Sequence, residues 1–162
     1  MRNGKALNRF AKKQSRRGTV TVEFAFIIPV FLVILLGMTE GSRLLEIQNA
    51  LATAAREGAR LAAMDRNEIT SPGQTTNQKI TADVQNFLVS TGVPGGDLDI
   101  RIAEVNDADT TFDLDDPAND LRLFQLHVAV PLSAISTFQI PGADQYTVGA
   151  KVVFRNGRAP RS

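Results

Sequence analysis

The chain has 162 residues, the usual size of one domain, and a formal net charge of +1. It contains no cysteine, which excludes disulfides, thiolate metal sites and a thiol nucleophile. The charge is unevenly distributed, because seven basic residues and no acidic residue precede Gly18. The rest of the chain holds 11 basic and 17 acidic residues, a formal charge of −6, which disfavours nucleic-acid binding. The seven basic residues are Arg2, Lys5, Arg9, Lys12, Lys13, Arg16 and Arg17.

Residues 1–18 are polar and basic and show no apolar period, so we expect an unfolded leader. Lysine and arginine next to a membrane span stay on the cytoplasmic side, which places the C-terminal part outside the cytoplasm. A secretory signal peptide also begins with basic residues, but it ends in a small-residue cleavage site. Residues 37–42 make a poor site of this kind, so we expect the following helix to stay attached.

Residues 19–39 form an apolar run whose only charged side chain is Glu23. A helix needs about 20 mainly apolar residues to cross the ~30 Å hydrocarbon core, so this run predicts a transmembrane helix. Pro29 lies inside it and predicts a kink. A carboxylate in hydrocarbon costs a few kcal/mol, so Glu23 needs a partner. This partner is the end of the chain, another subunit or the lipid headgroups.

Residues 40–64 are expected to extend the same helix, giving a rod of roughly 70 Å from Thr19 to Met64 at 1.5 Å per residue. Apolar and small residues recur at alternating spacings of three and four, which indicates one helix face that packs on another helix or a sheet. This helix-packing stripe either packs on its own domain or contacts neighbouring subunits, and the two are compatible. Its residues are Leu44, Ile47, Leu51, Ala54, Gly58 and Leu61.

Residues 65–156 are expected to form a small domain, followed by a disordered tail over residues 157–162. A loop over residues 65–74 precedes a short helix that begins near Thr76 and ends before Gly92. Apolar and polar residues alternate over residues 98–102, 124–132 and 146–154, which predicts three strands. Loops rather than crossover helices join them, so we predict an α+β fold with a three-stranded antiparallel sheet.

Residues 106–120 are rich in aspartate, and such oxygen-rich loops can supply calcium ligands. The usual calcium loop has a central glycine and a final glutamate, which are absent here, so we interpret the segment as a solvated surface loop. His127 is the single histidine and falls on the polar face of its strand, which indicates a surface residue. No phosphate-binding loop or nucleophile–base arrangement is present. We therefore predict no catalytic, cofactor-binding or metal-binding residue.

The junction between the leader and the apolar run resembles a known processing motif. Gly18, Glu23 five residues later, and Phe24 are similar to the motif of type IV prepilin-like proteins. The pattern P-x5-LLG-x2-E beginning at Pro29, and the sequence AAREGARLA over residues 54–62, resemble TadE/TadG-type pseudopilins. These are minor pilin-like subunits of the Tad (tight adherence) pilus, and the resemblance covers Arg16 to about Ala63.

The resemblance implies that a prepilin peptidase cuts after Gly18 and leaves Thr19 as the new N-terminus. Glu23 and Phe24 would then act in subunit pairing and assembly. It also implies a location in the bacterial inner membrane, with other pilin or pseudopilin subunits as partners. The function would be structural, in assembly of a pilus that serves cell adhesion or of a related secretion apparatus. A long helix followed by a small sheet is also the architecture of pilins.

Two other functions remain open from the sequence. One is a single-pass, membrane-anchored binding or sensor domain that does not assemble into a pilus. The other is an anchored enzyme, against which the lack of a catalytic constellation weighs. Cleavage after Gly18 separates the pseudopilin from an ordinary anchored domain, because such an anchor keeps its leader.

Overall fold

The computed structural model describes residues 15–64, 71, 73–138 and 141–157. It divides into two compact units, residues 1–42 and residues 43–162. Helix α1 (Ser15–Ala62) begins in the first unit and ends in the second. Ser15–Arg17, expected in an unfolded leader, are therefore helical, while residues 1–14 lie outside the described part. Once a helix has nucleated, each further residue adds one hydrogen bond, and arginine is a good helix former.

The first unit exposes the apolar side chains of α1. The large apolar residues from Val20 to Met38 are 41–77% exposed. Within the described residues, this is the one helix that is long and apolar enough to cross a membrane, by length and composition. The side chains contact no protein core, so lipid or another helix would have to cover them in the cell.

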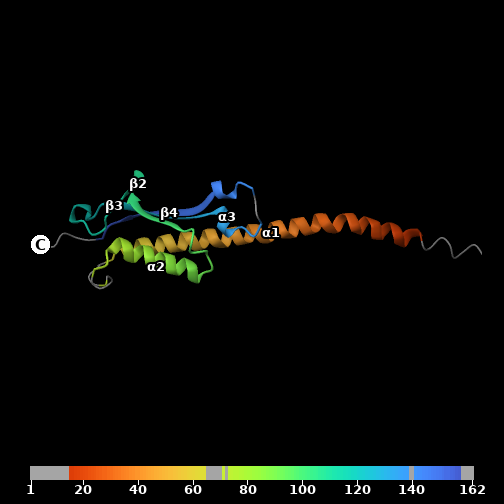
Figure 1. Cartoon of the computed structure of the whole chain (residues 1–162), viewed down its shortest axis with the longest axis horizontal. Helices are drawn as coiled ribbons and strands as arrows, with labels where there is room; N and C mark the ends of the chain where they lie inside the picture. The colour runs from red at the N-terminus through yellow and green to blue at the C-terminus, as the bar shows by residue number, and fades with distance from the viewer. Residues whose placement is uncertain (1–14, 65–70, 72, 139–140, 158–162) are drawn as a thin grey trace, which may run out of the picture. The chain divides into compact units, whose positions relative to one another are not determined.

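The second unit is an α+β domain, as predicted (Figure 1). Its sheet has four antiparallel strands in the order β2-β1-β3-β4. The expectation of three strands is therefore wrong. In addition to helix α2 (Thr76–Ser90), the described part of this unit contains three short helical segments: η2 (Pro117–Asn119), α3 (Leu132–Ile135) and η3 (Ala143–Gln145). The strands are β1 (Asp99–Glu104), β2 (Asp107–Thr111), β3 (Leu123–Pro131) and β4 (Thr147–Arg155).

Strand β2 is the additional strand, and it lies in the segment that we expected to be an acidic loop. All of its residues are exposed, so it lacks the alternation of apolar and polar residues that marks a half-buried strand. Aspartate is also depleted in strands. Pairing with β1 makes this segment a strand, with Thr111 opposite Ala103 and a register shift after that pair.

The core of the second unit lies between one face of the sheet and the two helices α1 and α2 (Figure 1). Alternate residues of β3 contribute to it, as the period of two predicts. The other face of β3 is less exposed than we expected, because Gln125 and Ala129 are only 2% and 3% exposed. Strands β1 and β4 flank β3 on both sides and pair with it along its length.

The start of α2 is held by the acidic segment. Thr75 caps the helix by accepting a hydrogen bond from the Gln78 N–H, and the Gln78 side chain accepts one from the Thr75 N–H. Asp115 Oδ2 accepts a hydrogen bond from the Thr76 N–H at 2.7 Å. The Asn77 side chain donates to the Phe112 carbonyl and accepts from the Leu114 N–H. A carboxylate at a helix N-terminus is favourable for the helix dipole.

We expect a fragment from Leu44 to Ser162 to be soluble and folded without the apolar part of α1. All buried apolar side chains of the described residues belong to the second unit, so the fragment keeps the complete core. Circular dichroism during heating should show one cooperative transition. A fragment that melts without cooperativity would show that this domain depends on the membrane helix or on a partner.

Candidate functional site

The predicted processing site lies at the start of α1. Gly18 is the fourth residue of the helix and Thr19 the fifth. The first four N–H groups of a helix have no acceptor within it, so this turn opens most easily. The backbone is thus helical at the predicted cleavage point, in a segment that unwinds at low cost.

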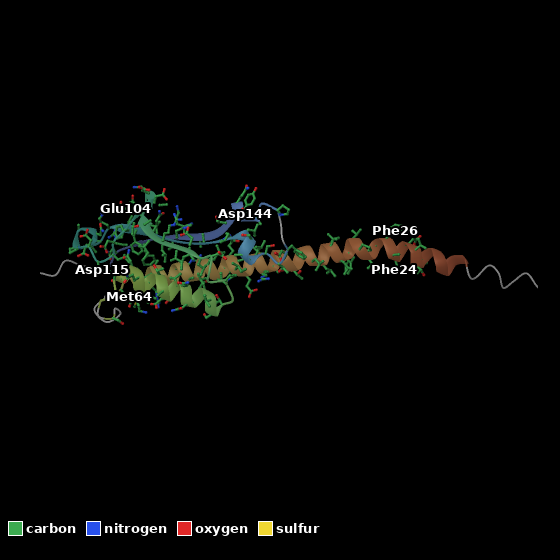
Figure 2. The ribbon with its side chains drawn as sticks, viewed as in Figure 1. Phe24, Phe26, Met64, Glu104, Asp115 and Asp144 are labelled. Carbon is green, nitrogen blue, oxygen red and sulfur yellow. The ribbon has the colours of Figure 1, made fainter. Side chains whose placement is uncertain are left out.

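Glu23 and Phe24 follow one turn later, and both side chains are exposed. Phe24 is 59% exposed and Phe26 is 77% exposed, and Figure 2 shows them on different sides of the helix. Among the side chains that the structure describes, none forms an ion pair or hydrogen bond with Glu23. The carboxylate therefore stands among exposed apolar residues without a partner in the described part of this chain.

The helix-packing stripe lies in the second unit. Ile47, Leu51, Ala54 and Gly58 are buried, while Leu44 and Leu61 are half-buried and pack against the core. The stripe is wider than the sequence pattern indicated, because the core also contains alanines beside it. A helix with 3.6 residues per turn buries three or four positions every two turns when it packs on a sheet. The additional alanines are Ala55, Ala59 and Ala62.

Gly58 is the point of closest approach within this stripe. A Cβ atom at Gly58 would lie 2.5 Å from Val84 Cγ2 of α2 and 2.8 Å from Leu126 Cδ2 of β3. The stripe is thus occupied by the chain's own domain, and this face is not open to a neighbouring subunit. The opposite side of α1 is polar, with an ion pair of 3.1 Å between exposed Glu57 and Arg60.

The end of α1 meets the C-terminal segment. A Cβ atom at Gly157 would lie 1.8 Å from the Ala63 carbonyl oxygen, so the backbone approaches closely there. The Asn156 side chain is fully buried and donates to the Asn119 carbonyl at 3.0 Å. The ordered domain therefore extends to Gly157, the first residue of the expected tail, while residues 158–162 lie outside the described part.

The carboxylates of the acidic segment are used in local turns. Asp107 accepts hydrogen bonds from the Asp109 N–H and the Thr110 hydroxyl, and Asp116 accepts one from the Ala118 N–H. Hydrogen bonds from the Thr110 hydroxyl and then the Asp109 N–H lower the pKa of Asp107. Among the described residues, no cluster of three or more metal-ligating side chains is present.

A cleft of about 440 Å³ lies between α2 and the β1–β2 pair. Asn77, Gln78 and Gln85 of α2 line one side of it. Its two ionisable residues, Arg101 and Asp109, form a loose ion pair of 3.7 Å. Hydrogen bonding and charge from Asp99 raise the pKa of Arg101. The described residues of this lining include no pair suited to nucleophilic catalysis.

His127 lies on the sheet face that points away from the core, opposite Arg101 on β1 and Lys151 on β4. It is half-buried rather than fully exposed. Two cationic neighbours in register do not form a metal-ligating or acid–base set with an imidazole. The structure therefore places the single histidine on the sheet face opposite the two helices, beside Arg101.

The comparisons with known proteins address the N-terminal part of the chain. Residues 18–60 match the model of the family described as TadE-like protein. No curated protein and no solved structure matches the chain. The family match begins at Gly18 and covers most of α1, including Glu23, Phe24 and five of the six stripe residues. The resemblance is thus confirmed, because residues 18–60 are similar to TadE-like proteins.

Proposed function

We propose that this protein is a structural, membrane-anchored pseudopilin of a Tad-type pilus or secretion assembly, processed by a prepilin peptidase. The observation that carries the proposal is the extent of the family match. It begins at Gly18, the junction between the basic leader and the apolar helix, and continues to Arg60. TadE-like pilins are structural proteins, which also supports a non-catalytic role.

The exposed apolar surface of α1 supports a membrane anchor. The apolar residues of the first unit are covered by no part of the described chain, and a bilayer would cover all sides of a single helix at once. Arg16 and Arg17 directly precede Gly18 and would keep the N-terminus in the cytoplasm. The second unit would then lie on the extracytoplasmic side of the bacterial inner membrane.

Glu23 would supply the contact between subunits. Cleavage after Gly18 gives Thr19 a free, positively charged amino group about one turn before Glu23. Two such charges are costly in hydrocarbon separately, and pairing lowers the cost of both. A neighbouring helix that is shifted along the axis can present its amino group to the Glu23 carboxylate. The helices of two subunits would thereby be held in a fixed register.

The replacement Glu23→Gln is expected to weaken association with partner pilins by at least about tenfold, because an ion pair worth 1.4 kcal/mol or more is lost. Insertion into the membrane and cleavage should persist, since glutamine is less costly than glutamate in hydrocarbon. The measurement is crosslinking and co-purification with the other pilin-like subunits in the native host.

The control for this experiment is Glu46→Gln. Glu46 is an exposed carboxylate of α1 in the second unit, beyond the apolar run, and should tolerate the same change. Equal association of the two variants and the unaltered protein would contradict the pairing. It would mean that Glu23 lies at the membrane–water interface and that its side chain reaches the lipid headgroups.

The cleft between α2 and β1–β2 favours a second candidate function. An anchored domain that binds a small ligand there would use the second unit for recognition and α1 as a tether. Such a protein keeps its leader and needs no ion pair at Glu23. Retention of residues 1–18 in the native host would therefore favour this function over the pseudopilin.

A further inference from the structure

One end of the second unit is tied to the part of α1 that follows the apolar run. The Arg43 guanidinium donates a hydrogen bond from Nη1 to Thr137 Oγ1 at 2.9 Å. Arg43 lies only four residues after Thr39, where the apolar run ends. Four residues span about 6 Å as a helix and at most about 14 Å when fully extended. Thr137 is therefore bound to a residue that lies only this length of chain beyond the apolar run.

Phe138 follows Thr137 and displays its ring at this end of the domain. The side chain is 45% exposed. The Ser136 hydroxyl donates to the Phe138 carbonyl at 2.8 Å and accepts from the Phe138 N–H at 3.3 Å. Because the backbone polar groups of Phe138 are satisfied locally, this residue can approach an apolar environment without leaving them unpaired.

Tyr146 exposes a second aromatic ring at the same end. It is 67% exposed, and its carbonyl accepts a hydrogen bond of 2.8 Å from the N–H of Leu132, the first residue of α3. Figure 2 shows Asp144 near α3, at the opposite end of the second unit from Asp115 and Met64. Arg43, Phe138 and Tyr146 thus share one end of the domain, which we call the Arg43 end.

We propose that the Arg43 end rests on the lipid surface, with the rings of Phe138 and Tyr146 in the headgroup region and Arg43 near the lipid phosphates. This inference rests on the membrane anchor of the proposed function. Each headgroup region is about 5–8 Å thick, comparable to the distance that the short tether allows. Aromatic residues gather at this depth, where a ring meets apolar material and a hydroxyl stays hydrated.

The arrangement of charges favours lipid over a protein partner at this end. Asp144 is exposed two residues before Tyr146 in the chain, so this end carries a carboxylate that a mainly apolar protein contact would have to desolvate. The two rings can enter a fluid headgroup layer while Asp144 remains in water. The contact is therefore shallow, and it would restrict how far the domain tilts away from the membrane.

The test uses the fluorescence of Tyr146, which is the single tyrosine of a chain without tryptophan. The full chain is reconstituted in vesicles whose lipids carry bromine near the top of the acyl chains, and flotation first confirms that it is membrane-bound. We expect the tyrosine fluorescence to fall by at least half relative to unbrominated vesicles. Bromine in both leaflets makes the result independent of the orientation of the chain.

Two double variants move the single tyrosine with minimal change in shape. Tyr146→Phe with Phe138→Tyr keeps the probe at the Arg43 end, and quenching should persist. Tyr146→Phe with Phe154→Tyr moves it eight residues along the chain, about 26 Å along β4. Phe154 is 37% exposed. Gly157, three residues later, lies against Ala63 near the C-terminal end of α1, far from Arg43 in that helix. Quenching of a tyrosine at position 154 should therefore be slight.

The outcomes separate the two proposals. A chain that floats with the vesicles but whose tyrosine is quenched equally at all three positions, or at none of them, overturns the contact of the Arg43 end and leaves the membrane anchor intact. A chain that does not float contradicts the anchor itself, and the lipid contact fails with it.

Discussion

Replacing Gly18 with leucine is expected to leave nearly all of the protein uncut in its native host, with residues 1–18 still attached. The unaltered protein should begin at Thr19, as N-terminal sequencing and intact mass of the membrane-extracted chain will show. The physical reason is the space that a peptidase needs around the bond to be cut. Glycine lets another backbone approach closely, whereas a leucine side chain occupies that space.

Gly37→Leu is the matched control for this experiment. Gly37 lies in the same apolar run, and a Cβ atom there would meet nothing within 4 Å. The two variants add the same apolar side chain to the same helix, so only the position relative to the predicted cut differs. If both variants are processed like the unaltered chain, or if the unaltered chain keeps its leader, the prepilin interpretation of this junction is wrong.

The replacement Gly58→Leu is expected to destabilise the Leu44–Ser162 fragment by about 3 kcal/mol or more. The first carbon of the new side chain would already lie 2.5 Å from Val84 Cγ2 and 2.8 Å from Leu126 Cδ2. Neither neighbour can move easily, because Val84 and Leu126 are buried in the core. A loss of this size is a large part of the 5–15 kcal/mol by which domains are usually stable.

Urea unfolding of the fragment measures the effect through the midpoint of the transition. Gly58→Ala should lose less stability, about 1 kcal/mol. Its methyl group clashes with the same neighbours, but alanine is about 1 kcal/mol more favourable than glycine inside a helix and offsets part of this cost. Arg56→Leu serves as the control, since Arg56 is an exposed residue of the same helix and should change stability little. An unchanged midpoint for Gly58→Leu would show that α1, α2 and the sheet are packed loosely at this point.

The two experiments examine different parts of one helix. The part of α1 in the first unit would contain the cleavage site, the membrane span and the Glu23 contact. The helix-packing stripe, in the second unit, is buried in the domain core. Changes near Gly18 and Glu23 should therefore leave the fold of the fragment unaffected, because the fragment lacks these residues. Contacts between subunits would have to come from the apolar part of α1 and from surfaces other than the stripe.

Several features could be read from the sequence because they depend on residues that are near one another in the chain. The apolar run is defined by composition and length, and the Gly18–Glu23–Phe24 motif by spacing, and the family match begins at that motif. Helix α2 was predictable from its apolar period and from the glycines and proline that follow it, and β1, β3 and β4 were predictable from alternation. The α+β class followed from the order of these elements.

The tertiary structure decided what depends on residues distant in the chain. Strand β2 exists because β1 pairs with it, although its own residues disfavour a strand. Asp115 became a partner of Thr76 only when the chain brought the acidic segment to the start of α2. Gln125 is buried because two strands flank β3, and Gly58 is required because Val84 and Leu126 meet it there. The sequence alone determined the apolar helix and its motif, because insertion into a bilayer depends on local composition. Long-range pairing determined the sheet, its edge strands and the Arg43 end.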